Sequence, residues 1–202
     1  DVVECLSETG AEILISPNGS PFEWKKPDVR MNIAVARVVE SGLPLLYVNQ
    51  VGGQDELVFD GGSFVLNADG RLAVQLPAWQ EAIVVTEWSK TADGWTCTTG
   101  ERAVVEEGDA GAYVACMVGL RDYVDKNGFP GVVLGLSGGV DSALVAALAV
   151  DALGPARVQC VMLPYRYTSQ ASLADAAGCA RALGVRYDTV PIAGPVEGFL
   201  QD

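Results

Sequence analysis

The sequence predicts an α/β fold, and three patterns in it carry this prediction. Short runs of Val, Ile and Leu have the length and composition of buried strands. Segments with apolar residues at helical spacing lie between several of these runs, and turn-forming glycine, asparagine and proline residues separate them. Half of the 202 residues are apolar, so the chain has enough material for a core.

The beginning of the chain is predicted to form a strand and then a long helix. The strand is expected over 11–16, ended by the turn-forming sequence "PNGSP". The helix is expected over 26–41, with Pro27 in its first turn and Gly42 as its left-handed cap. The residues at helical spacing on its apolar face are Met31, Val35, Val38 and Val39.

The middle of the chain reads as a β-meander followed by a linker. Strand runs are expected within 43–52, 56–76 and 81–89, with a hairpin turn at Asp69-Gly70. From 90 to 111 the sequence turns to small and acidic residues, which we interpret as a linker. This places a boundary after residue 108 and gives two domains, 1–108 and 109–202.

The second domain has the element order of a parallel sheet. A helix capped by Asp109 is followed by strand-like runs that begin near 131, 157 and 186. Helices over 142–153 and 169–184 separate these runs, the later one with Ser172 and Asp175 as a capping box. This βαβαβ order predicts a doubly wound parallel sheet with ligands bound beyond the carboxyl ends of its strands.

Charge and cysteine content weigh against some classes of function. The chain has 13 basic and 26 acidic residues, a net charge of −13 that repels phosphate backbones, so we expect no nucleic-acid partner. No apolar run reaches the roughly 18 residues of a membrane span, so no membrane partner is expected. Five scattered cysteines fit a reducing, cytoplasmic location. Because the first methionine is Met31, we expect a segment of a longer protein.

The stretch "VVLGLSGGVDSALVAALAV" (132–150) carries the strongest functional pattern. An apolar strand ending in Gly135 and Leu136 runs into a short polar loop, and an apolar helix follows. The loop residues are Ser137, Gly138, Gly139, Val140, Asp141 and Ser142. Paired glycines let the backbone approach a ligand, and free N–H groups at a helix start bind anions. The pattern predicts a phosphate site, with Asp141 as a ligand of a bridging Mg²⁺.

The loop sequence also resembles a known signature. No lysine follows the glycines, so it is not the usual P-loop. "SGGVDS" resembles the ATP pyrophosphatase (PP-loop) superfamily, whose members cleave ATP between its α- and β-phosphates to adenylate a substrate oxygen. With "NGFPGVVLGLSGGVDSAL" and "VMLPYRYTSQASLADA", it is similar to NAD synthetase of the glutamine-dependent kind.

The first part of the chain supports the same resemblance. "GAEILISPNGSPF", a helix with an arginine, and "FDGGSFVLNADG" are similar to the carboxyl-terminal half of a nitrilase-type amidase domain, which that family carries as its glutaminase. The resemblance implies a partial nitrilase-like α-β sandwich. It is followed by a parallel sheet of the PP-loop (adenine nucleotide alpha hydrolase) type.

The resemblance further implies a reaction and its participants. ATP and the carboxylate of nicotinate adenine dinucleotide would form an adenylate, and ammonia, free or from glutamine, would displace AMP to give NAD. The parent protein would be a ligase and a homo-oligomer, and the segment alone would be inactive. The segment 162–170 would meet the nucleotide at the end of the second strand of this sheet. Main-chain groups near Met162 and Leu163 would bind adenine, and Arg166 or Gln170 would lie near ribose or phosphates. Arg166 is explained equally well as a solvated surface charge.

The glutaminase site is expected to be incomplete in this sequence. By the resemblance, its glutamate base, lysine and cysteine nucleophile lie before residue 1. Cys5 is not expected to replace the nucleophile, because it lies in an amphipathic helix whose Val2, Val3 and Leu6 suggest a stripe facing the core. Ser20 and Lys26 are the expected glutamine-binding residues, although a turn serine beside a surface lysine explains them nearly as well.

Two alternatives stay open. One is another PP-loop adenylating enzyme, of the GMP synthetase or tRNA thiolase type. The negative charge and the lack of a C-x-x-C motif disfavour the tRNA enzyme, and the absence of histidine disfavours the glutaminase of a GMP synthetase. The other alternative is a nucleotide-binding segment with no activity of its own.

Overall fold

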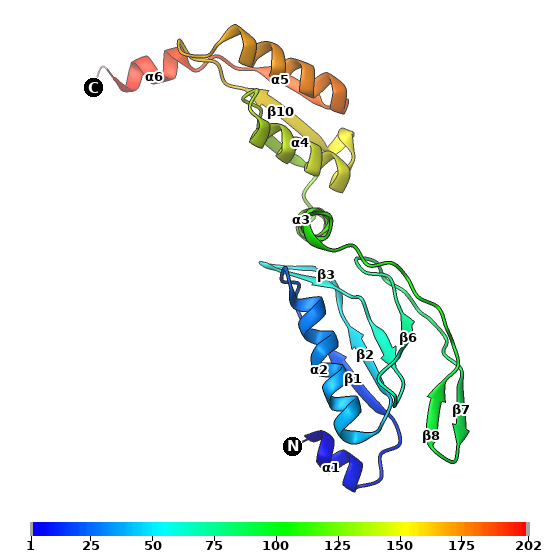
Figure 1. The fold of residues 1–202 in the computed structure, drawn as a ribbon. Helices are drawn as coiled ribbons and strands as arrows, with labels where there is room; N and C mark the ends of the chain where they lie inside the picture. Colours follow the sequence, from blue (N-terminus) through cyan, green and yellow to red (C-terminus); the bar gives the residue numbers. More distant parts are fainter. Residues whose placement is uncertain (1, 201–202) are drawn as a thin grey trace. The chain divides into compact units, whose positions relative to one another are not determined.

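The computed structural model describes residues 2–200, and the chain divides into two compact units (Figure 1). The division falls between Gly119 and Leu120, inside helix α3 (Gly108–Lys126). The domain boundary predicted after residue 108 lies at the start of the same helix and stays a prediction. No helix within residues 2–200 combines the length and apolarity needed to cross a membrane.

The first unit is built on a mixed four-stranded sheet in the order β1-β2-β5-β6. These strands are β1 (Leu14–Asn18), β2 (Leu45–Asn49), β5 (Phe64–Leu66) and β6 (Leu72–Gln75). Strands β1 and β2 are parallel, and the other neighbouring pairs are antiparallel. The strand over 11–16 was predicted to stop before Pro17, but β1 continues through it. Because β1 is an edge strand, the missing proline N–H does not break the sheet.

Helix α2 (Lys26–Ser41) connects β1 to β2 and packs on one face of this sheet (Figure 1). The predicted bounds are confirmed, and Gly42 has the left-handed conformation (φ 67°) expected of a cap. The predicted apolar face was wrong at Val39, which is exposed, whereas Val38 and Ala34 are buried. Arg30 is also buried, which the apolar pattern did not indicate.

Two antiparallel hairpins and a short helix complete the first unit. They are β3 (Val51–Gln54) with β4 (Leu57–Asp60), β7 (Trp88–Thr91) with β8 (Gly94–Cys97), and α1 (Val2–Glu8). The linker predicted from residue 90 was therefore wrong in its first part, and Asp93-Gly94 is the hairpin signal that was overlooked. The strand predicted over 81–89 was wrong before Trp88. The stripe predicted in α1 was wrong at Val2 and Leu6, which are exposed, whereas Val3 is half-buried and packs against the core of this unit.

The second unit contains a three-stranded parallel sheet in the order β11-β10-β9, as the βαβαβ pattern predicts. Its elements are β9 (Val132–Gly135), α4 (Val140–Leu153), β10 (Val158–Met162), α5 (Gln170–Leu183), β11 (Arg186–Thr189) and α6 (Ala193–Phe199), with the short 3₁₀ turn η1 (Pro155–Arg157) before β10. Two predicted caps were wrong. Asp109 lies inside the first turn of α3, and α5 is capped by Ser169, whose hydroxyl accepts the Ser172 N–H at 3.0 Å.

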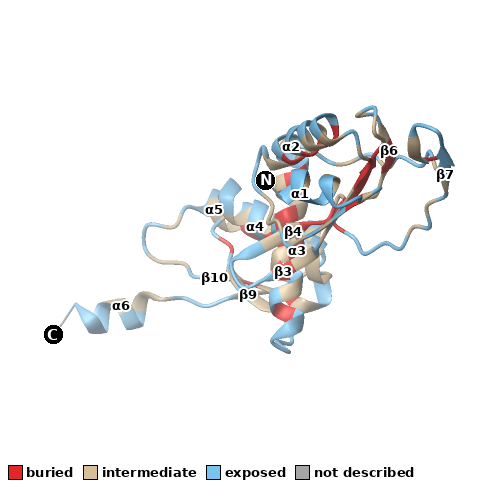
Figure 2. Ribbon diagram, turned by 90° about the horizontal axis from the view of Figure 1, so that it is seen from below, coloured by how far each residue is buried: buried red, intermediate tan, exposed pale blue. Residues whose placement is uncertain are grey.

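Each unit has its own core. In the first unit the buried residues gather on the strands of the sheet, as the red segments of Figure 2 show at β6. In the second unit the core includes Leu136 directly after β9, Val158 and Cys160 of β10, and Ala146 and Ala176 of the helices. The small alanines let α4 and α5 approach the sheet closely, so the loop after β9 is fixed between packed elements.

Candidate functional site

The predicted phosphate loop lies at the carboxyl edge of the parallel sheet. Strand β9 ends at Gly135, and the Leu136 N–H still donates to the Val161 carbonyl of β10 at 2.9 Å. Helix α4 begins at Val140, only four residues later. Because parallel strands lead into their helices at one edge, the first turn of α5 also lies beside this loop.

Gly138 is the residue that lets the loop meet α5. Its φ is +83°, a left-handed conformation that residues with a side chain rarely adopt. A Cβ added there would lie 2.4 Å from the carbonyl oxygen and 2.9 Å from the Cα of Ser172. Only glycine therefore fits at this contact. Gly139, by contrast, has an extended conformation, and its added Cβ would meet nothing closer than 3.5 Å.

Two serine hydroxyls organise the loop from within. The Ser142 hydroxyl accepts the Ser137 N–H at 3.2 Å and donates to the Gly139 carbonyl at 3.0 Å. The Ser137 Oγ accepts the Gly139 N–H at 3.3 Å and lies 3.1 Å from the Ser142 Oγ. Gly139, which the sequence pattern proposed as an anion donor, thus already has an internal acceptor.

The remaining N–H groups of the loop are available to a ligand. Those without an acceptor among residues 2–200 belong to Gly138, Val140, Asp141 and Ser142. Four such donors at the start of a 14-residue helix form a site suited to an anion, because the helix dipole also favours negative charge there.

A cavity of about 410 Å³ opens beside this loop, between the carboxyl ends of β9 and β10. Of the predicted residues, Gly135, Leu136, Ser137 and Leu163 line it. The segment 162–170, which was predicted to meet the nucleotide, also contributes Met162, Tyr167, Thr168 and Ser169 to the lining. Sequence reasoning missed Val161 of β10 and Ser172 in the first turn of α5. The polar run "YTSQAS" directly after the second parallel strand is the signal that could have indicated Ser172.

Arg166 and Gln170 do not line this cavity. The Arg166 guanidinium carbon lies 5.2 Å from the ring centroid of Tyr165 and 4.8 Å from that of Tyr167, so both rings hold the cation at the rim. Gln170 is exposed at the first position of α5. The structure therefore brings Arg166 near the cavity through Tyr167 and leaves Gln170 outside its lining.

Asp141 is exposed in the first turn of α4. Among the described residues, no cluster of three or more His, Cys, Asp or Glu could hold a metal ion alone. Mg²⁺ is commonly bound by one or two carboxylates together with substrate phosphates and water. A single carboxylate beside an anion site therefore fits a Mg²⁺ that arrives with a nucleotide.

The two expected glutamine-binding residues lie in the first unit, on the loop after β1 and at the start of α2. Asn49, at the end of β2, accepts the Ser20 N–H at 2.9 Å and donates to the Ser20 carbonyl at 3.1 Å. The Lys26 ammonium donates to the Glu23 carboxylate at 2.6 Å. This hydrogen bond lowers the pKa of Glu23, because it stabilises the ionised carboxylate.

Sequence reasoning missed a buried ion pair behind Ser20. Arg30 of α2 and Asp60 at the end of β4 have side chains only 8% and 5% exposed, and Arg30 Nη1 lies 2.6 Å from Asp60 Oδ2. The sequence analysis noted an arginine in this helix only as part of a resemblance. The spacing of apolar residues along a helix does not indicate which distant residue pairs with a charged one.

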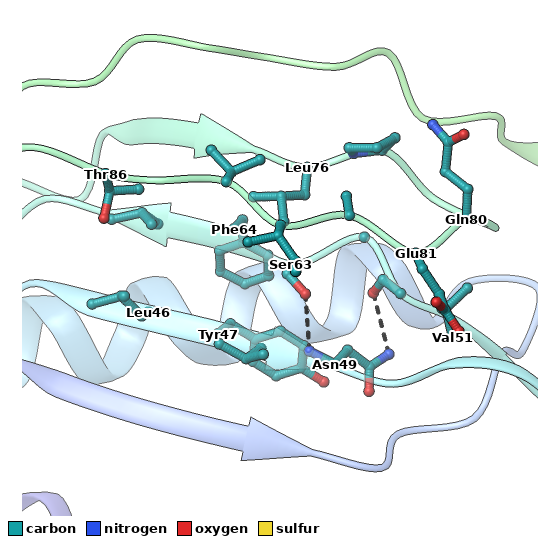
Figure 3. A pocket seen from close by; sticks show the side chains of 18 residues that line it. Leu46, Tyr47, Asn49, Val51, Ser63, Phe64, Leu76, Gln80, Glu81 and Thr86 are labelled. Atoms are coloured by element: carbon teal, nitrogen blue, oxygen red, sulfur yellow. Dashed lines mark hydrogen bonds between the residues drawn. The ribbon is translucent and has the colours of Figure 1, made fainter.

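A further cavity, of about 710 Å³, lies on the face of the first sheet away from α2 (Figure 3). Apolar residues such as Leu46, Val65 and Leu76 line it, and the segment 80–86 passes over it. One of its polar contacts lies within the sheet, where the Asn49 N–H donates to Ser63 Oγ at 3.0 Å, as drawn in Figure 3. No predicted site residue lines this cavity. Because its lining is mostly apolar, it is better suited to packing than to catalysis.

Two family models match this chain, one after the other along the sequence. Residues 2–95 match the carbon-nitrogen hydrolase family, and residues 112–202 match the NAD synthase family. Among curated proteins, the glutamine-dependent NAD(+) synthetase of Rhodobacter capsulatus is 56% identical over 99% of this chain, and that of Acinetobacter baylyi is 40% identical over the whole chain. In both cases the chain spans 37% of the relative's length.

A solved structure agrees with these matches. The glutamine-dependent NAD+ synthetase of Acinetobacter baumannii, determined in complex with ADP, superposes with a TM-score of 0.91 at 43% identity, covering 98% of this chain and 38% of that one. The predicted fold class, a partial nitrilase-like sandwich followed by a PP-loop type sheet, is confirmed. The chain belongs to the glutamine-dependent NAD synthetase family, of which it carries part of the carbon-nitrogen hydrolase domain and part of the NAD synthase domain.

Proposed function

We propose that the protein containing this chain is a ligase that uses ATP to convert nicotinate adenine dinucleotide to NAD, with ammonia released from glutamine. The observation that carries the proposal is the loop 137–142, whose free N–H groups lie beside a cavity at the carboxyl edge of a parallel sheet. Family membership adds support, because relatives with the same domain order carry that name.

In this proposal the loop binds the phosphates of ATP. The N–H groups of Gly138, Val140, Asp141 and Ser142 donate to phosphate oxygens, and Ser137 and Ser142 keep the loop in shape through their hydroxyls. Adenine lies in the 410 Å³ cavity near Leu163, where Tyr167 offers a ring for stacking. The ADP complex of the Acinetobacter baumannii relative is consistent with an adenine nucleotide as ligand.

The chemistry at this edge is transfer of an adenylyl group. A carboxylate oxygen of nicotinate adenine dinucleotide attacks the α-phosphorus of ATP, the bond to the β-phosphate breaks, and pyrophosphate leaves. The loop donors stabilise the negative charge that grows on the pyrophosphate, because they are already oriented before the reaction. Ammonia then attacks the activated carbonyl, and AMP leaves. A Mg²⁺ held by Asp141 would supply further neutralisation of phosphate charge.

In the first unit, Ser20 and Lys26 are proposed to bind the α-carboxylate of glutamine. Lys26 would exchange its Glu23 partner for this carboxylate. The nucleophile, base and lysine of the glutaminase are proposed to lie outside this chain, so the segment alone should hydrolyse no glutamine. A cytoplasmic location is proposed because all five cysteines are free. A homo-oligomer stays a prediction.

The experiment is isotope exchange of pyrophosphate into ATP by the full-length protein, with and without nicotinate adenine dinucleotide. Exchange is expected only with the dinucleotide, because adenylation of its carboxylate must precede the reverse reaction. Exchange that ignores the dinucleotide but responds to xanthylate or to tRNA would overturn the proposal in favour of another PP-loop enzyme. Ammonia release from glutamine by the 202-residue segment would contradict the placement of the nucleophile.

A further inference from the structure

The Ser20 loop is held by a guanidinium whose three nitrogens all donate to protein groups. Arg30 has five N–H groups. Nη1 donates to Asp60 Oδ1 and Oδ2 at 2.8 and 2.6 Å, Nη2 donates to the carbonyls of Ser20 and Pro21 at 2.9 Å each, and Nε donates to Ser20 Oγ at 3.1 Å. All three nitrogens of the guanidinium therefore donate to protein groups, which ties Arg30 to the Ser20 loop and to Asp60.

The same contacts determine what Ser20 can still do. Its N–H is taken by Asn49 Oδ1, and its carbonyl accepts from both Arg30 and Asn49. Because a guanidinium only donates, Ser20 Oγ must accept from Nε, which leaves the hydroxyl proton as the one group Ser20 can offer. Within residues 2–200 that proton has no acceptor.

The arrangement places a polarised hydroxyl at a fixed position. A hydroxyl that accepts from a cation becomes a better donor, because hydrogen bonds in series strengthen one another. Asp60 neutralises the buried charge of Arg30, and Asn49 Nδ2 contacts Asp60 Oδ1 at 3.3 Å, so the three side chains form one network. A carboxylate is the natural acceptor for the resulting donor.

We propose that Arg30 is a positioning residue for amino-acid substrate recognition: it orients the Ser20 hydroxyl so that its proton points to the α-carboxylate of the substrate. This inference rests on the proposed glutamine site and adds to it the group that selects the carboxylate. Asp60 and Asn49 hold Arg30 and the Ser20 backbone, and none of the three touches the substrate.

The test uses the full-length enzyme with Arg30→Lys. Lysine keeps the charge opposite Asp60, but its three donors cannot serve Asp60, both carbonyls and Ser20 Oγ together. The readout is the ratio of kcat/KM for glutamine to kcat/KM for glutamine methyl ester, which lacks the carboxylate. This ratio is expected to fall about tenfold in Arg30→Lys, as for loss of a hydrogen bond to a charged group.

The matched control is Arg37→Lys, on the same helix. Arg37 lies seven residues after Arg30 in α2 and forms an ion pair with Glu40, with 2.7 Å between Nη1 and Oε2. Its substitution should leave the ratio unchanged. A general loss of structure would lower kcat/KM for glutamine and kcat/KM for glutamine methyl ester together and leave their ratio unchanged. An unchanged ratio in Arg30→Lys, or an equal change in Arg37→Lys, would overturn the proposal.

A second variant covers the case in which Arg30→Lys does not fold. Ser20→Ala removes the hydroxyl from a loop and should lower the ratio to the same extent, and an unchanged ratio there also refutes the inference. In the double variant, Arg30→Lys should add nothing to Ser20→Ala, because both act through one hydroxyl. NAD formation with free ammonia is measured in every preparation: its absence in the wild type would refute the proposed function, whereas its presence with an unchanged ratio refutes only the role of Arg30.

Discussion

Substitution of Gly138 by alanine tests the central feature of the nucleotide site. The φ of +83° costs an L-residue about 1–2 kcal/mol. The new Cβ would lie 2.4 Å from the Ser172 carbonyl oxygen, and overpacking of this kind costs about 1–3 kcal/mol. The obstacle is the backbone of α5, which cannot rotate away as a side chain can. The loop itself must therefore move.

The sum of the two effects, about 2–5 kcal/mol, sets the expected loss. If displacement of the loop N–H groups removes about 3 kcal/mol of transition-state stabilisation, the rate of dinucleotide-dependent exchange of pyrophosphate into ATP falls roughly 100-fold, because 1.4 kcal/mol is a factor of ten. The assay is this exchange in the full-length protein, with the thermal unfolding midpoint measured in parallel.

Two other glycines provide the controls. Gly139→Ala adds a Cβ to a residue of negative φ with 3.5 Å of clearance, so it should retain exchange within a few-fold. Gly154, after the last residue of α4, has a similar positive φ (+80°), but a Cβ added there meets nothing, so Gly154→Ala should lower stability without selective loss of exchange. Equal exchange in Gly138→Ala and Gly139→Ala would refute the claim that contact between the loop and α5 shapes the site.

Three further predictions concern the ion pair at Lys26, the core and a buried thiol. Glu23→Gln should lower KM for glutamine about twofold, as expected for release of Lys26 from an exposed ion pair; a raised KM would contradict competition. Because Lys26 lowers the pKa of Glu23, the ion pair should persist above that lowered pKa and be lost as the pH falls through it. In Lys26→Met, NMR titration should show that the pKa of Glu23 has returned to its ordinary range. Leu136 is 1% exposed, so Leu136→Ala should destabilise the second unit by about 2–5 kcal/mol in urea unfolding. A loss under about 1 kcal/mol would contradict this prediction, because it would mean that neighbouring side chains fill the space left by leucine. Burial raises the pKa of the Cys160 thiol, so native protein at pH 8 should label there far more slowly than protein in urea; equal rates would contradict its burial.

Several elements of the fold follow from local signals alone. Pro27 and Gly42 bracket α2, and the alternation of apolar strands with helices after residue 131 predicted the parallel sheet. The loop 137–142 was predictable for the same reason: its glycines stand directly after a strand and before a helix, so position and residue type indicated an anion site together.

Other features could not be predicted because their causes lie far apart in the chain. The strand predicted over 81–89 did not form before Trp88, although its composition favours strands, because a strand also needs a partner edge. Ser172 lines the cavity beside the loop after β9, because its backbone lies against Gly138, which is 34 residues earlier in the chain.

By itself the sequence determined the order of strands and helices in the parallel sheet, the bounds and cap of α2, and the position of a glycine loop at a strand end. These depend on neighbouring residues, whose preferences are readable from spacing. Only the tertiary structure decided which distant groups share a site: Arg30 with Asp60, Asn49 with Ser20, and Gly138 with Ser172. The physical reason is that a buried donor must find an acceptor wherever folding brings one, and local periodicity carries no record of that choice.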